Sequence, residues 1–146
     1  MPAAYPRLLR TAPDPGPPLI RLMVGLVFLS EGIQKFLFPA IRGAGRFEKI
    51  GLPAPDILGS LVGSVEVICG LLVLLGLLTR CAVIPLIAIM LVAIFTTKIP
   101  LLSEEGLWAM LHAWRTDLSM LIGSIYLLIK GGGSYSLDRK LFSREK

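Results

Sequence analysis

The chain has 146 residues, of which 54% are hydrophobic and 17% charged, and its mean hydropathy is +0.74. This excess of apolar side chains excludes an ordinary water-soluble domain and indicates a protein that crosses a membrane several times. The formal net charge of +5 raises the question of nucleic acid binding. The Lys and Arg residues are scattered over helix ends and tails without interleaved aromatic residues, so we expect no nucleic acid partner.

Four apolar stretches are long enough to cross a bilayer, whose core of about 30 Å needs about 20 helical residues. They are residues 18–38, 56–78, 82–102 and 108–130. Together they predict an all-α fold, an antiparallel four-helix bundle integral to the membrane and in contact with the lipid bilayer. This domain, residues 18–130, is expected to follow a Pro-rich leader, residues 1–17, and to precede a basic tail, residues 131–146.

The distribution of Lys and Arg predicts the orientation of this bundle. If the N-terminus is cytoplasmic, the cytoplasmic side carries Arg7, Arg10, Arg21, Arg80, Lys130, Arg139, Lys140, Arg144 and Lys146, and the other side carries Lys35, Arg42, Arg46, Lys49, Lys98 and Arg115. The excess favours both termini inside. A cleaved signal peptide is disfavoured, because Glu31 and Lys35 stand where a cleavage site needs small residues.

The first two stretches each carry one marked face. In residues 18–38, steps of four and three residues place Arg21, Gly25, Phe28, Gly32 and Lys35 on one stripe of a helix. In residues 56–78, the same rhythm joins Gly59, Gly63, Glu66, Gly70, Val73 and Leu77. Small residues let membrane helices approach closely, so Gly25, Gly32, Gly59, Gly63 and Gly70 are predicted helix-packing positions.

The last two stretches are bounded by turn and capping residues. Residues 78–81 form a short connection that predicts antiparallel neighbours. Pro100 is expected to end the third helix, and Ser103, followed by Glu104 and Glu105, is expected to begin the fourth. Three glycines, residues 131–133, predict its end.

Charged residues inside these helices are the most informative feature of the sequence. A charge at the centre of a membrane helix costs roughly 2.5–3.5 kcal/mol, so such residues are paired, cavity-facing and often functional. In the proposed orientation Glu31, Lys35, Glu66, Lys98, Arg115 and Asp117 all fall in the outer half of the bilayer, whereas Arg21 can extend to the inner surface. We expect these outer charges to converge on one polar chamber.

Two details of this chamber follow from spacing. Glu31 and Lys35 are four residues apart and are expected to pair, with Gln34 on the same side. Glu66 lies on a glycine seam, so it must meet a partner from another helix or water. The alternative interpretation is that the charges only fix the helix register through buried hydrogen bonds.

The sequence offers little for a metal or haem. His112 is the sole histidine and, five residues before Asp117, faces a different side of the helix. We expect it to hydrogen-bond a loop or Glu105 rather than to ligate a metal or porphyrin. The spacing of Cys69 and Cys81 matches neither a redox pair nor a metal knuckle, so both are predicted to be buried thiols.

Several stretches resemble the DoxX family of small four-helix membrane proteins. They are Arg21-Leu22-x-x-Gly25 with Phe28, Gly32 and Lys35; residues 47–55; Val65-Glu66 with Gly70; residues 76–80; Arg115-Thr116-Asp117; and residues 131–138. The resemblance implies a multi-pass protein of the bacterial plasma membrane with a link to redox work, since relatives include subunits of a thiosulfate:quinone oxidoreductase. It carries Glu31, Lys35, Glu66 and Asp117 over as polar positions, not as catalysts.

The favoured function is a subunit of a membrane oxidoreductase system that holds a quinone or a similar small apolar redox ligand. Glu66, Glu31 and Asp117 are candidate proton-exchanging groups, and Lys35, Gln34, Lys98 and Arg115 are candidate ligand-binding groups. No covalent cofactor, flavin or metal centre is expected, so a redox protein partner is required. The alternative is a structural or assembly subunit of a larger membrane complex, or of a homo-oligomer; a small transporter is less favoured.

Overall fold

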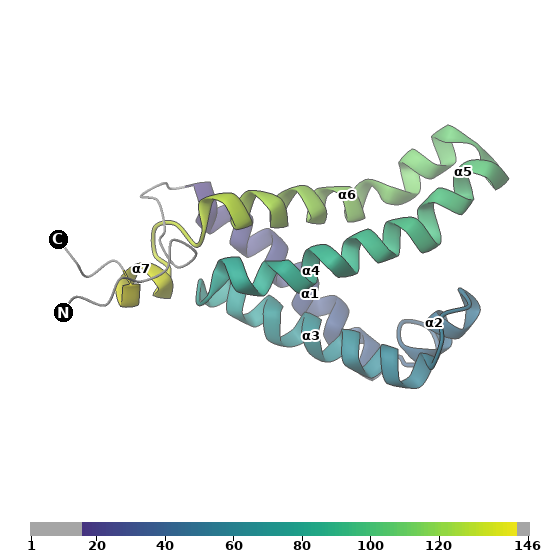
Figure 1. Ribbon diagram of the computed structural model, residues 1–146, viewed down its shortest axis with the longest axis horizontal. Coiled ribbons are helices and arrows are strands. Elements are labelled where there is room, and N and C mark those ends of the chain that lie inside the picture. The colour runs from purple at the N-terminus through teal and green to yellow at the C-terminus, as the bar shows by residue number, and fades with distance from the viewer. Residues whose placement is uncertain (1–15, 143–146) are drawn as a thin grey trace.

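The computed structural model describes residues 16–142, and every regular element in that range is a helix (Figure 1). The elements are α1 (Gly16–Leu37), α2 (Ala44–Lys49), α3 (Pro55–Leu75), α4 (Thr79–Ala93), the π-helix η2 (Ile94–Lys98), α5 (Ile99–Glu105), α6 (Leu107–Lys130) and α7 (Leu137–Phe142). The predicted all-α class is confirmed. Most of the expected leader lies outside the described residues; its last two residues, Gly16 and Pro17, begin α1.

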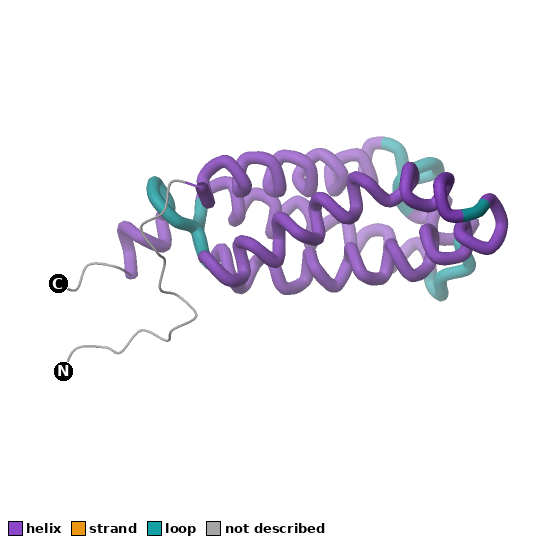
Figure 2. The backbone as a smooth tube through the Cα atoms, turned by 90° about the horizontal axis from the view of Figure 1, so that it is seen from above, coloured by secondary structure: helices purple, strands orange, loops and turns teal. Residues whose placement is uncertain are grey.

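The long helices pack side by side in an antiparallel arrangement. Helix α1 packs on α3, α3 on α4, α4 on α6, and α6 returns to α1. Each runs opposite to the one before it, as the colour ramp of Figure 1 shows. Figure 2 shows the long helices lying side by side. The start of α1 and α7 lie together at one end of the molecule, which we call the clasp end. Helices α2 and α5 lie at the opposite end, which we call the cavity end.

Three segments of this structure are long and apolar enough to cross a membrane: Gly16–Leu37, Pro55–Leu75 and Thr79–Glu105. Helix α6 matches them in length, with 24 residues, but its first half contains His112, Arg115 and Asp117, which lower its hydropathy. Length and composition therefore identify three candidate spans among the described residues. This finding supports the prediction that the protein is a membrane protein.

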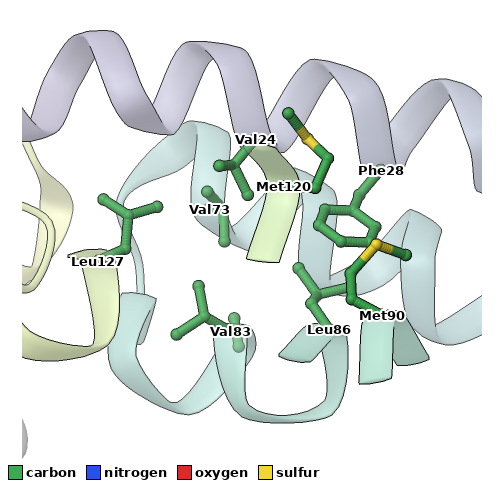
Figure 3. Close-up of a cluster of buried hydrophobic side chains, with 9 residues drawn as sticks. Val24, Phe28, Val73, Val83, Leu86, Met90, Met120 and Leu127 are labelled. Atoms are coloured by element: carbon green, nitrogen blue, oxygen red, sulfur yellow. The ribbon is translucent and has the colours of Figure 1, made fainter. Parts of the chain in front are cut away.

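A compact apolar core lies between these helices. Val24, Phe28, Val73, Val83, Leu86, Met90, Met120 and Leu127 converge from α1, α3, α4 and α6 (Figure 3). Many large apolar side chains instead point outward, and Leu19 and Ile57 are 72% and 70% exposed. In water this surface would be a liability; against lipid chains it is the expected exterior.

Glycines bring α1 and α3 unusually close together. The buried residues of α3 are Gly59, Gly63, Glu66, Gly70 and Val73, which is the stripe that the spacing predicts. A Cβ added at Gly70 would lie 2.8 Å from the backbone N of Leu29, and one at Gly32 would lie 2.8 Å from the backbone O of Gly63. The backbones of the two helices are thus in contact at positions where only hydrogen atoms fit between them.

The boundary between the third and fourth predicted spans differs from expectation. Pro100 does not end the helix, because it occupies the first turn of α5, where its missing N–H does no harm. Ser103 does not begin the next helix, and its hydroxyl donates to the carbonyl O of Pro100 at 2.7 Å. The break comes at Gly106, whose φ of 88° belongs to the left-handed region that favours glycine.

Arg21 is buried rather than extended to a membrane surface. Its side chain is 6% exposed, and its guanidinium donates to the carbonyl O atoms of Val73 (2.9 Å) and Leu74 (2.6 Å) in the last turn of α3. It also donates to the carbonyl O atoms of Gly132 (3.2 Å) and Tyr135 (3.4 Å). The expectation that this residue snorkels was wrong, because the end of α3 and the segment after α6 offer it acceptors inside the protein.

Asp138 completes the clasp end from the opposite side. Its carboxylate accepts from the backbone N–H groups of Leu78 (2.6 Å) and Thr79 (3.0 Å) at the start of α4, and its own N–H donates to the carbonyl O of Gly76 at 2.8 Å. A side chain from α7 thus caps a helix that begins about sixty residues earlier in the chain. Residues 131–138, expected as part of a tail, are packed into the fold.

Candidate ligand-binding site

A cavity of about 520 Å³ lies between the helices at the cavity end. Its apolar wall includes Val27, Phe28, Val62, Ile89 and Met120. Seven charged residues also line it: Glu31, Lys35, Arg42, Arg46, Glu66, Lys98 and Asp117. A cavity of this volume, mostly apolar and with a few polar groups, has the size and composition of a small-molecule site.

The first of two ion pairs in this cavity joins α1 to α3. Lys35 Nζ lies 2.5 Å from Glu66 Oε2, and the side chains are 11% and 3% exposed. Gly32 and Gly63, one turn before each partner, provide the close helix approach that makes the pair so short. Lys35 therefore pairs across helices with Glu66, and not with Glu31 on its own helix as the spacing predicted.

The second ion pair joins η2 to α6. Lys98 Nζ lies 3.3 Å from Asp117 Oδ2, with side-chain exposures of 16% and 21%. The wide π-helical turn brings Thr96, Thr97 and Lys98 to the cavity wall. The Thr96 hydroxyl donates to the carbonyl O of Val92 at 2.7 Å and the Thr97 hydroxyl to that of Ala93 at 2.6 Å, which satisfies carbonyls that a π-turn shifts out of register.

Three charged residues of the cavity stand outside these pairs. Across residues 16–142, no salt bridge joins Glu31, Arg42 or Arg46 to another described side chain. Arg46 lies on α2 and is half-buried, and Arg42 precedes α2 and is exposed. Neither arginine was predicted to line the site, because both fall in a Gly- and Pro-rich connection whose path no periodic pattern reveals.

Two predicted ligand-binding residues do not reach the cavity. The Gln34 side chain donates to Ser30 Oγ at 3.0 Å, and the Arg115 guanidinium donates to the backbone O of His112 at 2.7 Å. Neither lines the cavity, so the chamber unites five of the six expected outer charges and excludes Arg115. The rotation of α6 about its axis explains this: it turns Asp117 inward and therefore Arg115, two residues earlier, outward.

The other candidate ligands lie elsewhere. His112 is exposed on α6, and Cys69 and Cys81 are half-buried free thiols; none of them lines the cavity. Within the described part of the chain, no group of three or more His, Cys, Asp and Glu side chains is arranged to hold a metal ion. The arrangement is therefore one of apolar walls and hydrogen-bonding charges.

Comparison with known proteins places this architecture in a family. The family model described as DoxX matches residues 16–99, which include α1, α3, α4 and most of the charged cavity wall. The chain belongs to the DoxX family. Within it, the chain is 54% identical to the "Uncharacterized membrane protein Rv3486" of Mycobacterium tuberculosis, over 97% of this chain and 90% of that protein.

A second relative is more distant in sequence. The chain is 28% identical to the "Putative oxidoreductase CatD" of Bacillus subtilis, over 88% of each chain. No solved structure matches this DoxX protein.

Proposed function

We propose that this DoxX protein is a four-helix bundle of the bacterial plasma membrane, with α6 as its fourth span and both termini in the cytoplasm. The antiparallel order of the helices supports this arrangement. The sequence supports the orientation, because the predicted topology gives nine Lys and Arg residues to the cytoplasmic side and six to the other side. The cavity then lies in the outer half of the bilayer.

We further propose that the cavity binds a quinone or a similar apolar redox ligand, and that the protein serves a membrane oxidoreductase system. The observation that carries the proposal is the cavity of about 520 Å³, which combines an apolar wall with titratable side chains from separate helices. A quinone ring needs both: apolar surface for the ring, and groups at its carbonyls that donate and accept protons. The name of the Bacillus subtilis relative points to the same class of chemistry.

The ion pairs divide the proposed roles among the carboxylates. Glu66 and Asp117 are each paired with a lysine, so we assign to them the role of accepting a hydrogen bond from a ligand hydroxyl. Glu31 has no cation paired to it in the described structure and is the best candidate to give up and take back a proton. Electrons would come from a protein partner, because the proposed site is one of binding and proton exchange.

The proposal is tested by purifying the full chain in mild detergent and titrating it with a short-chain ubiquinone analogue, followed by quenching of Trp fluorescence. We expect saturable binding, and at least tenfold weaker binding in Val62→Trp, which fills the apolar wall. The matched control is Leu61→Trp, the neighbouring residue on the exposed face of α3, which should leave the affinity unchanged.

The same purification tests the alternative, a structural subunit. A stoichiometric larger partner, together with no saturable quinone binding to the chain or to the complex, would overturn the ligand proposal. Equal quinone affinity in Val62→Trp and Leu61→Trp would also contradict it, because binding would then not involve the cavity.

A further inference from the structure

The charges of the cavity do not cancel. Four cations and three carboxylates line it, so the wall carries one excess positive charge when all are ionised. Lys35 and Lys98 are each opposed by a carboxylate, and a neutralised cation attracts a further anion weakly. The charges outside these pairs are Arg42, Arg46 and Glu31, and Glu31 offsets only one of the two cations. The excess positive charge therefore resides on the two arginines.

These two arginines are held in place by tight backbone packing. A Cβ added at Gly59 would lie 2.8 Å from the backbone N of Ala44, and one at Gly43 would lie 2.6 Å from the carbonyl O of Lys35. The segment that carries both arginines thus sits directly on α3 and on the end of α1. Its glycines allow this approach, and the segment forms one wall of the cavity with Arg46, Phe47 and Ile50.

The two kinds of cavity surface come from different parts of the fold. The apolar surface comes mainly from α1, the first half of α3, α4 and α6, whereas both arginines come from the connection between α1 and α3. This connection lies at the cavity end, where α2 is labelled in Figure 1. A ligand that fills the cavity along this direction has its apolar body among Val27, Phe28 and Ile89 and its far end at the guanidinium groups. Guanidinium groups bind acidic oxygens with strong charge-assisted hydrogen bonds.

We propose that the cavity selects an amphiphilic anion, with an apolar ring or chain inside the helices and an acidic oxygen between Arg42 and Arg46. This deepens the quinone proposal, on which the choice of probe rests, by naming the charge state that the site prefers and the residues that set it. Two sources share this chemistry: an acidic hydroxyquinone and a fatty acid.

The test compares two quinones that differ by one methyl group. A 2-hydroxy-3-alkyl-1,4-naphthoquinone is ionised at neutral pH, and its 2-methoxy counterpart is uncharged. We expect the wild-type protein to bind the hydroxy form more tightly, by on the order of tenfold or more, and this preference to fall with rising salt concentration. Arg46→Gln should remove most of the preference and Arg42→Gln part of it, because each should weaken binding of the hydroxy form more than binding of the methoxy form.

Controls separate charge from damage to the fold. Arg115→Gln makes the same chemical change at the same end of the molecule, outside the cavity, and should retain the full preference. Arg46→Lys should retain part of it, because it keeps the charge without the guanidinium fork. Dodecanoate and dodecanol form a second probe pair; preference for the acid in this pair alone would assign the site to fatty acids.

Equal affinity of the wild-type protein for the charged and uncharged members of both pairs would overturn the inference. An unchanged preference in the Arg42→Gln, Arg46→Gln double variant would do so as well. These outcomes differ from a failure of the quinone proposal, in which neither quinone binds but dodecanoate still binds more tightly than dodecanol.

Discussion

At the scale of single residues, the short pair between Lys35 and Glu66 is the most demanding interaction in the protein. Both side chains are almost fully buried, so each is tolerated only because the other is present. Removing one partner of a buried pair leaves an uncompensated charge, whereas replacing both with apolar residues is often neutral. This asymmetry distinguishes a buried pair from the more open one between Lys98 and Asp117.

We therefore predict that Lys35→Met lowers the free energy of unfolding by about 3–5 kcal/mol, and that adding Glu66→Leu restores most of it. Lys98→Met should cost only about 1 kcal/mol, because that pair is longer and partly exposed. Unfolding of the three purified variants and the wild-type protein in mixed micelles by increasing SDS measures these differences. A double variant as unstable as Lys35→Met alone would contradict the prediction.

A second residue-scale prediction concerns Asp138, whose carboxylate accepts from two N–H groups at the start of α4. Asp138→Ala leaves both donors without that acceptor and should lower the free energy of unfolding by about 1–2 kcal/mol. Asp138→Asn keeps one side-chain acceptor, so its free energy of unfolding should lie between those of the wild-type protein and Asp138→Ala. The control is Glu104→Ala, which removes an exposed carboxylate at the other end of the molecule. The variants are compared by thermal unfolding in detergent. An equal loss of stability in Glu104→Ala and Asp138→Ala would contradict the capping role.

Residue-scale features divide clearly into those that the sequence predicted and those that it did not. Glu66 could be placed because an acid on a glycine stripe in a membrane helix must find a partner. Its partner was not predicted, and Lys35 was expected to pair with Glu31 instead, since the choice depends on which helices touch. Asp138 was missed because its capping partners lie about sixty residues away, beyond any local motif.

At the scale of the elements, the seam between α1 and α3 determines where the cavity charges lie. The four-three spacing of glycines indicated this seam directly, and the buried residues of α3 follow it. The face of α6 was less predictable, because its polar residues are spread around the helix and hydropathy alone does not show which of Arg115 and Asp117 points inward. The π-turn of η2 also has no simple sequence signature, although Thr96 and Thr97 provide the hydroxyls that stabilise it.

We predict that Gly70→Ala separates α1 from α3 and costs about 1–3 kcal/mol, because the added methyl would meet the backbone of Leu29, which cannot move alone. Gly123→Ala on α6 is the matched control. Its Cβ would meet side-chain atoms of Val24 and Met23, and the gain in helix propensity offsets part of that crowding. The two variants are compared by thermal unfolding in the same detergent, and an equal or smaller loss at Gly70 would show that the seam is not tightly packed.

At the scale of the whole molecule, the two ion pairs join the helices in two sets. One pair joins α1 to α3, the other joins η2 to α6, and the cavity lies between the sets. Within the described residues, no salt bridge crosses the cavity. A ligand that contacts both sets would therefore hold them together, and its binding should raise the melting temperature.

The membrane arrangement gives a prediction at this same scale. With Cys69 and Cys81 replaced by Ala, single cysteines at Glu48 and Glu104 should react with a membrane-impermeant maleimide on intact cells, and one at Lys140 only after permeabilisation. All three positions are exposed. Because α6 separates Glu104 from Lys140, labelling of both from the same side would show that α6 does not cross the bilayer.

The clasp end has a consequence for how the protein is made. Residues 132–138 provide two of the four carbonyl acceptors of Arg21 and the carboxylate at the start of α4, yet they are translated after every long helix. During biosynthesis Arg21 in the first helix therefore lacks two of its four carbonyl acceptors until residues 132–135 have left the ribosome. A nonsense codon just after Lys130 would spare all the hydrophobic helices and still give a product that we expect membrane proteases to degrade.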